Sequence, residues 1–316
     1  MNKKSVKLNA IEVCAGAGGQ AIGLESAGFE PVALIDNDEN TNITLKANRP
    51  TWPVLNEDLN AFEGNHYKGV DLVAGGLPCP PFSVAGLQKG EKDERDLFPA
   101  MLRLVAEIRP KAVMIENVRG LLATRFSDYR ARILDQLSSL GYSGEWKLLN
   151  ACDFGLSQYR PRAILVVLQD EIANSFVWPM PDEQPPLTVG EKLYDLMASR
   201  GWPGADAWRE KACSIAPTIV GGSLKHGGPD LGPTRAKKAW EALGVDGHGI
   251  VDEPPGPDFV GNPRLTVRMV ARLQGFPDSW EISGSKTAAY RQVGNAFPPP
   301  VAHAVASKIR LCLVPH

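Results

Sequence analysis

The residue with the clearest chemical potential is a cysteine held between prolines. Cys79 stands in the segment GGLPCPPFS at positions 75–83, directly after a short apolar run. Proline fixes the backbone φ and removes an amide donor, so this loop would present the thiol rigidly. A thiolate is a strong nucleophile for covalent catalysis. The other four cysteines are scattered along the chain, and we interpret them as small buried apolar residues.

A glutamate and two arginines stand where they could assist that thiol. Glu116 closes the apolar run 111–116, and the edge formed by the carboxyl ends of parallel strands is where open α/β sheets place their sites. We therefore expect Glu116 to face Cys79. Arg160 and Arg162, in QYRPR at 158–162, come just before another apolar run. From position alone, the alternative is that the glutamate caps a helix or lies in a loop, and that the arginines form surface ion pairs.

A glycine-rich loop near the N-terminus indicates a nucleotide site. Gly16, Gly18 and Ala21 fit the G-x-G-x-x-G/A pattern that lets a backbone turn tightly and approach a ligand. Asp36 follows twenty positions after Gly16, where a carboxylate can accept hydrogen bonds from ribose hydroxyls. Asp58, after a third expected strand, is a further candidate. These residues alone leave NAD, FAD and S-adenosylmethionine open as ligands.

Short apolar segments alternate with amphipathic ones through the first half of the chain. This alternation predicts a parallel sheet covered by helices on both faces, an α/β fold of the Rossmann-like kind. One predicted helix places Leu97, Met101, Leu104, Val105 and Ile108 on a single face, between Asp96 and Pro110. Further helices are expected over 126–140 and from about Pro298. The expected strands are 10–14, 31–36, 52–55, 70–74, 111–116 and 163–168.

The second half has a different character. Residues 179–263 are rich in Pro and Gly and weakly periodic, with one helix-like island at 235–243. We predict a smaller, loop-rich domain over 179–284, and a main domain formed by 1–178 and 285–316. A long disordered insertion is the alternative, against which four tryptophans between Trp178 and Trp240 argue.

Composition sets limits on partners. The chain has 316 residues, 43% of them apolar, and a formal net charge of −2. A strongly basic nucleic-acid binder is excluded, so any such binding must rest on a local cationic face. No apolar run approaches the roughly 20 residues of a membrane span. Unpaired, scattered cysteines are typical of a reducing compartment, and we expect a cytoplasmic protein.

Taken in order, these motifs resemble those of the cytosine-5 DNA methyltransferase family, of the bacterial restriction-modification or orphan type. The resemblance spans nearly the whole chain. It rests on six segments: GAGG at 16–19, PCPPFS at 78–83, ENV at 116–118, QYRPR at 158–162, RLTVRMVARLQGFP at 264–277 and GNA at 294–296. Three positions depart from the family pattern, which usually has Phe at Cys14, Gln at Pro80 and a larger residue at Asn37. Of these, Cys14 and Asn37 bear on cofactor affinity rather than on the type of reaction.

The resemblance implies a mechanism. The Cys79 thiolate attacks carbon 6 of cytosine, and carbon 5 then takes a methyl group from S-adenosylmethionine. Loss of the carbon 5 proton and elimination of Cys79 restore the ring. Glu116 would hold ring nitrogen 3 and the amino group, Arg162 would orient the ring, and Arg160 would support the same loop. The target base must leave the helical stack of the duplex to be reached.

The resemblance also implies a Rossmann-like methyltransferase sheet with a target-recognition domain. The cofactor would be S-adenosylmethionine, the product S-adenosylhomocysteine, and no metal is expected. The implied cofactor-binding residues are Cys14, Ala15, Gly16, Ala17, Gly18, Gly19, Asp36, Asn37, Asp58, Leu59, Pro78, Asn295 and Ala296.

The expected partner is double-stranded DNA. The loop 85–95, with Gly86 and Gly90 as hinges, is predicted to close over it. The candidate DNA-binding residues are Ser83, Gln88, Lys89, Thr218, Lys225 and Arg235. We further expect a monomer that does not bind membranes, with a cognate restriction endonuclease acting separately.

Three alternatives use parts of the same pattern. An RNA cytosine methyltransferase acting on tRNA would share the core, although the long recognition domain favours DNA. A nicotinamide-dependent oxidoreductase would explain the glycine loop and Asp36 but neither Cys79 nor Glu116. A catalytically inactive DNA-binding module would be expected to lose Cys79 or Glu116, and both are present.

Overall fold

The computed structural model describes residues 7–78, 96–222 and 229–314. The chain forms two compact units. The first comprises residues 1–149, 161–180 and 301–316, and the second comprises 150–160 and 181–300. Residues 150–160 and 285–300 thus pack with the second unit, whereas the functional boundaries at 178/179 and 284/285 stay a prediction. Cys79, Ser83, Gln88, Lys89 and Lys225 lie outside the described residues.

The first unit is built on a seven-stranded sheet with the order β3-β2-β1-β4-β5-β7-β6. Strands β1 to β5 pair in parallel, as the sequence predicted. The strands are β1 (Leu8–Val13), β2 (Phe29–Asp36), β3 (Val54–Asn56), β4 (Leu72–Gly76), β5 (Ala112–Val118), β6 (Tyr142–Asn150) and β7 (Pro161–Gln169).

Two strands correct the prediction. β7 runs antiparallel to β5, and β6 was not predicted. Only residues 151–160 separate β6 from β7, too few for the helical crossover that a parallel neighbour needs. The sheet is therefore mixed rather than wholly parallel.

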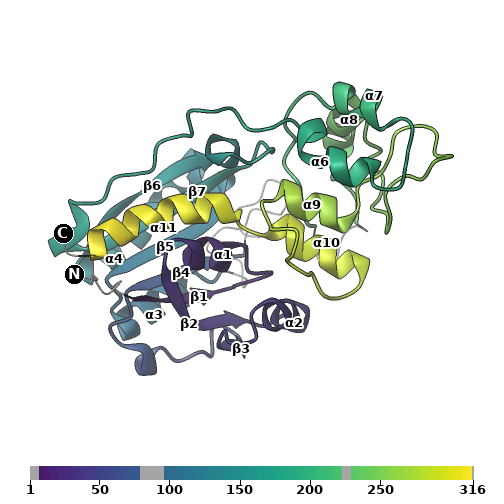
Figure 1. Cartoon of the computed structure of the whole chain (residues 1–316). Coiled ribbons are helices and arrows are strands. Elements are labelled where there is room, and N and C mark those ends of the chain that lie inside the picture. The colour runs from purple at the N-terminus through teal and green to yellow at the C-terminus, as the bar shows by residue number, and fades with distance from the viewer. Residues whose placement is uncertain (1–6, 79–95, 223–228, 315–316) are drawn as a thin grey trace, which may run out of the picture. The chain divides into compact units, whose positions relative to one another are not determined.

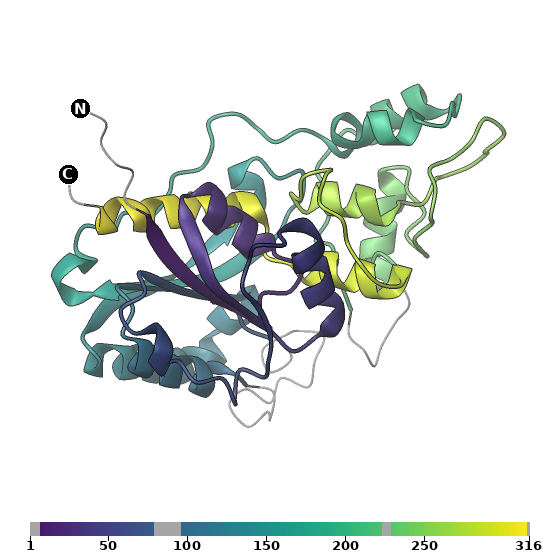
Figure 2. The same ribbon diagram turned by 60° about the horizontal axis from the view of Figure 1, so that its bottom comes forward.

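Helices cover both faces of this sheet. α1 and α11 lie on one face, and α3 and α4 on the other (Figures 1 and 2). The predicted apolar face of α3 is confirmed, because Met101, Leu104, Val105 and Ile108 are fully buried in the core. Asp96 accepts a hydrogen bond from the Phe98 amide and so begins this helix. The α-helices that accompany this sheet are α1 (Gly19–Ser26), α2 (Glu39–Asn48), α3 (Phe98–Ile108), α4 (Ser127–Ser139), α5 (Asp170–Ala173) and α11 (Pro299–Leu313).

The second unit is ordered and more helical than predicted. Its tryptophans Trp202, Trp208 and Trp240 are buried, which argues against a disordered insertion. Its helices are short, so their periodicity is weak in the sequence. They are α6 (Val189–Ala198), α7 (Ala205–Lys211), α8 (Thr234–Ala242), α9 (Val267–Leu273) and α10 (Lys286–Asn295).

Single turns of 3-10 helix complete the described structure. They are η1 (Asn65–Tyr67), η3 (Arg119–Leu122), η4 (Thr124–Phe126) and η5 (Ala151–Phe154). Throughout the described ranges, no helix is long and apolar enough to cross a membrane.

Candidate active site

A carboxylate binds the backbone of the glycine loop after β1. Asp36, at the end of β2, accepts hydrogen bonds from the Gly16 amide at 2.8 Å and from the Asp38 amide at 2.9 Å. Gly16 and Gly18 have φ values of 53° and 86°, the left-handed region that glycine enters at little cost. Cys14 also has a positive φ of 54°, which is uncommon for a residue with a side chain. Asp36 thus shapes the glycine loop, and its binding of ribose hydroxyls stays a prediction.

Carboxylates surround the start of this loop. Glu12 is buried in β1, and burial together with the negative charge of Asp36 raises the pKa of its carboxyl well above the usual value. Burial, followed by the charges of Asp36, Glu12 and Asp58, also raises the pKa of the Cys14 thiol. Cys14 is therefore protonated at neutral pH and is no nucleophile. Such an acidic environment suits a ligand that carries positive charge.

The remaining predicted cofactor residues vary in exposure. Ala15, Ala17, Gly18, Gly19 and Leu59 are buried, while Asn37, Asp58, Pro78 and Asn295 are exposed and Ala296 is half-buried. Gln20, the second residue of α1, is buried, and neither its amide nitrogen nor its oxygen has a partner within the described part of the chain. A buried amide beside the glycine loop is an available donor and acceptor for a bound cofactor.

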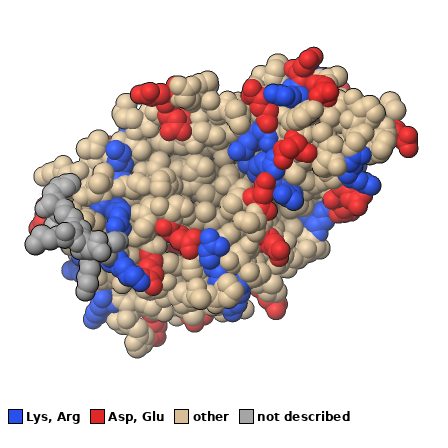
Figure 3. Space-filling model, in the orientation of Figure 1, with Lys and Arg blue, Asp and Glu red and all other residues tan. Residues whose placement is uncertain are grey.

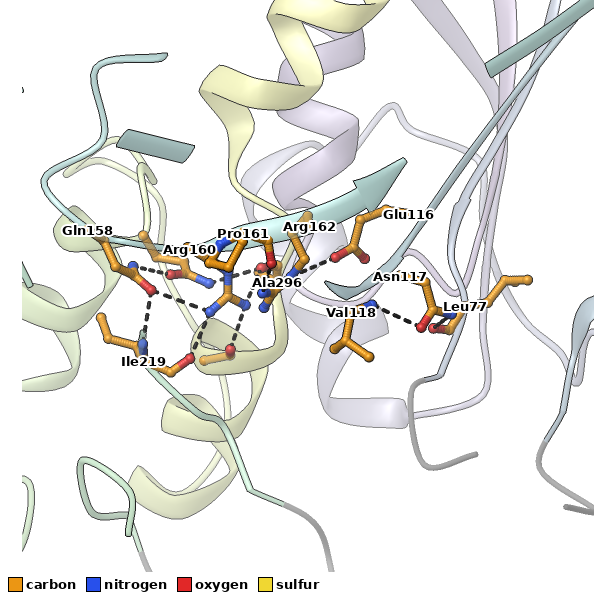
Figure 4. Close-up of polar contacts among 12 residues, drawn as sticks. Leu77, Glu116, Asn117, Val118, Gln158, Arg160, Pro161, Arg162, Ile219 and Ala296 are labelled. Atoms are coloured by element: carbon orange, nitrogen blue, oxygen red, sulfur yellow. Dashed lines mark hydrogen bonds and ion pairs between the residues drawn. The ribbon is translucent and has the colours of Figure 1, made fainter. Parts of the chain in front are cut away.

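An ion pair between side chains joins β5 to β7 in the first unit. Arg162 Nε lies 2.7 Å from Glu116 Oε1, and both side chains are nearly buried (Figure 4). Antiparallel pairing sets this contact, because Val118 of β5 stands opposite Arg162 and Glu116 opposite Ile164. A nearly buried ion pair of this kind fixes the orientation of the carboxylate.

Glu116 also lies beside the segment that leads to Cys79. Gly76, the last residue of β4, pairs with Glu116 across the sheet. A methyl group placed on Gly76 would stand 3.2 Å from Glu116 Oε2, so this second oxygen lies close to Gly76, three positions before Cys79 in the sequence. The next residue, Asn117, donates to the Leu77 carbonyl at 3.3 Å and accepts from the Val118 amide at 2.9 Å (Figure 4). The expected shared edge of β4 and β5 is therefore present up to Pro78.

Arg160 has a different environment from Arg162. Its side chain is fully buried and donates to the carbonyls of Ile219, Gly294 and Ala296 at 2.7, 2.9 and 2.9 Å (Figure 4). These contacts are with the backbone of the second unit. They agree with the expected supporting role of Arg160 and distinguish it from Arg162, which contacts the Glu116 carboxylate.

Two predicted DNA-binding residues are described. Thr218 is half-buried, and its hydroxyl donates to the Tyr159 carbonyl at 2.7 Å. Arg235 is exposed on the first turn of α8. Sequence reasoning missed Asn117 as the residue that holds Leu77, and Gln158 as a partner of Ile219. The sequence did carry a signal for both residues, because Asn117 belongs to the ENV motif at 116–118 and Gln158 to the QYRPR motif at 158–162.

Comparison with known proteins decides the family. Residues 8–226 and 234–311 match the family described as C-5 cytosine-specific DNA methylase. The chain belongs to this family. The methylase is thus a DNA (cytosine-5-)-methyltransferase, as the motifs predicted, and membership implies S-adenosylmethionine as methyl donor. The oxidoreductase alternative is excluded.

Curated relatives agree closely. The methylase is 52% identical over 312 residues to type II methyltransferase M.NaeI from Lentzea aerocolonigenes, covering 97% of this chain and 75% of the relative. It is also 52% identical over 309 residues to type II methyltransferase M.NgoMIV from Neisseria gonorrhoeae, covering 96% and 97%.

Solved structures show the same fold at low identity. A mutant of Spodoptera frugiperda DNMT2 matches with a TM-score of 0.66 and 18% identity over 96% of this chain and 99% of that one. Entamoeba histolytica methyltransferase EhMeth matches with a TM-score of 0.68 and 16% identity over 98% and 100%. The mixed sheet with its antiparallel β7 is therefore the methyltransferase fold.

Proposed function

We propose that this methylase modifies carbon 5 of cytosine in duplex DNA through a covalent bond to Cys79, with Glu116 and Arg162 holding the base. The observation that carries this proposal is the ion pair between Glu116 and Arg162, placed beside Gly76 where the Cys79 loop begins. It supplies a fixed carboxyl group beside the end of β4, the strand that precedes Cys79 in the sequence.

The chemistry needs both groups because cytosine is a poor nucleophile at carbon 5. The Cys79 sulfur forms a bond to carbon 6, and the displaced electron pair makes carbon 5 nucleophilic. Carbon 5 takes the methyl group, a base removes its proton, and the sulfur–carbon bond breaks to return the thiolate. The Glu116 carboxyl shares a proton with ring nitrogen 3 and accepts from the amino group as charge develops. The contact with Arg162 keeps that carboxyl in place.

S-adenosylmethionine supplies the methyl group when it is bound. The residues described around the glycine loop fit it, because its sulfonium and ammonium groups are cationic and the loop is flanked by Glu12, Asp36 and Asp58. Asp36 organises the loop, and the buried Gln20 amide offers further hydrogen bonds. Pro78, Asn295 and Ala296 complete the proposed set by resemblance to the family.

The second unit supplies target recognition in this proposal, through Thr218, Arg235 and, from the sequence alone, Lys225. On the face shown in Figure 3, lysines and arginines are interspersed with acidic residues rather than forming one uniform basic surface. Local contacts, rather than the net charge of −2, therefore have to offset the few kcal/mol that extrusion of the base costs.

We further propose that the methylase is the modification partner of a restriction endonuclease that reads the same duplex sequence, as a type II enzyme. This rests on the names of the two relatives at 52% identity. It acts as a monomer in the bacterial cytoplasm in this proposal.

Bisulfite sequencing tests the activity and finds the target at once. DNA from cells that express the methylase should show unconverted cytosines at one recurring short sequence and nowhere else. Cells with the empty vector provide the control. Complete conversion of every cytosine in cells that contain folded protein would contradict the proposed activity on DNA, and methylation of tRNA instead would support the RNA alternative.

A further inference from the structure

The segment Thr218–Gly222 of the second unit is exposed in part yet held by side chains along its length. The Ile219 amide donates to Gln158 Oε1 at 2.9 Å, and the Ile219 carbonyl accepts from Arg160 at 2.7 Å. The Val220 carbonyl accepts from the Tyr290 hydroxyl at 3.1 Å, and the Gly222 carbonyl from Asn295 Nδ2 at 3.4 Å. We call this set of contacts the backbone clamp.

The clamp is reinforced by close backbone packing. A methyl group on Gly221 would stand 2.5 Å from Asn295 Oδ1 and 2.7 Å from the Arg291 carbonyl. One on Gly294 would stand 2.5 Å from the Gly221 Cα. All three distances are shorter than real contacts of a methyl carbon, so glycine is needed on each side. Helix α10 therefore touches the segment through its backbone, which fixes the separation of the two.

The residues behind the clamp are themselves fixed. Gln158 Nε2 donates to Gln274 Oε1 at 2.7 Å, so the orientation of its amide is determined. Arg160 is fully buried and also holds the Gly294 and Ala296 carbonyls. Burial and the charge of Asp230 raise the pKa of Tyr290, so its hydroxyl remains a donor at every physiological pH.

What the clamp presents outward is a short, rigid edge. The Val220 side chain is 42% exposed, and Gly222 is also exposed. The side chain of Ile219, which stands between Thr218 and Val220 in the sequence, is buried. Exposed loops seldom have their carbonyls individually bound by buried donors, because water satisfies them. Rigidity in an exposed segment reduces the ordering cost of binding a partner.

We propose that Tyr290, Gln158 and Arg160 are positioning residues that hold Thr218–Gly222 as a preformed contact for the DNA backbone. The partner class rests on the proposed function, in which Thr218 belongs to the DNA-binding set. The positioning role rests on the clamp itself. None of the three needs to touch DNA, because they act through the segment they hold.

Tyr290→Phe is the sharpest test, since it removes only the hydroxyl that binds Val220. Tyr142→Phe is the matched control: its buried hydroxyl donates to the Pro110 carbonyl at 2.6 Å in the first unit. Both variants lose one tyrosine–carbonyl hydrogen bond. The probe is a duplex with the site found by bisulfite sequencing, and the readouts are its Kd, the single-turnover rate at saturating DNA and the thermal midpoint.

We expect Tyr290→Phe to raise the Kd for the duplex about fivefold, the size of one lost hydrogen bond, with a single-turnover rate close to wild type. Tyr142→Phe should lower the thermal midpoint similarly and leave the Kd unchanged. An unchanged Kd for Tyr290→Phe, or an equal rise for both variants, would overturn the positioning role. Methylation of the probe duplex by the wild-type protein is measured first. A wild-type protein that does not methylate the duplex would contradict the proposed function, and this outcome is distinct from a failure of the positioning role.

Discussion

Two arginines two positions apart in one motif have separate tasks. Arg162 contacts the Glu116 carboxylate at 2.7 Å, whereas Arg160 contacts three backbone carbonyls. The resemblance to the family implied that Arg162 orients the ring and that Arg160 supports the same loop. The directions of the two side chains in the structure distinguish Arg162, which contacts the Glu116 carboxylate, from Arg160, which contacts backbone carbonyls.

The ion pair gives a residue-scale prediction. Arg162→Lys keeps the charge but loses the planar Nε donor that holds Glu116, so the single-turnover rate should fall on the order of 100-fold. Binding of duplex DNA should change little, because the lysine remains cationic. Arg49→Lys is the control, since Arg49 pairs with Glu25 at 2.9 Å on the surface. Equal rates for wild type and Arg162→Lys would show that the orientation of Glu116 does not limit the reaction.

The environments of four cysteines differ from the predicted ones. Cys14, Cys152 and Cys312 are half-buried and Cys213 is exposed, so the prediction that these residues are buried is wrong in degree. The raised pKa of Cys14 could not be predicted from spacing, because it depends on Glu12, Asp36 and Asp58 gathering from three separate segments.

At the scale of elements, hydrophobic periodicity in the sequence predicted the strands and helices that are apolar and long. Strands β1, β2, β4, β5 and β7 and the helices α3, α4 and α11 all follow apolar patterns in the sequence. β6 did not, because it lies at the edge of the sheet and carries Ser143, Glu145 and Lys147. The antiparallel direction of β7 depends on the length of a connection rather than on its composition.

The close approach of β4 to β1 gives an element-scale prediction. A methyl group on Gly75 would stand 2.5 Å from Val13 Cγ2 and 2.9 Å from the Val13 carbonyl. Gly75→Ala should therefore lower the free energy of unfolding by about 1–3 kcal/mol, as overpacking does. Gly256→Ala, where a methyl group meets nothing within 4 Å, should be neutral. Equal stability of the two variants in urea would refute the tight packing.

At the scale of the whole molecule, residues that are neighbours in the sequence belong to different compact units. The QYRPR motif is divided, with Gln158 and Arg160 packed in the second unit and Arg162 in the first. The functional boundary at 284/285 stays a prediction, whereas the compact second unit continues through α10 to residue 300. A sequence cannot reveal this, because the contacts that join residues 158–160, 219 and 294–296 are made by the buried side chains of Arg160 and Gln158 between segments far apart in the sequence.

The central claim is that methyl transfer passes through a covalent bond to Cys79. A duplex with 5-fluorocytosine at the target position tests it directly, because fluorine cannot leave as a proton does and the adduct persists. Incubation with the methylase and S-adenosylmethionine, followed by proteolysis and mass spectrometry, should yield a nucleotide linked to the peptide that contains Cys79. Cys79→Ser should yield none. An adduct on another residue, or methylation of ordinary duplex by Cys79→Ser at the wild-type rate, would contradict the account.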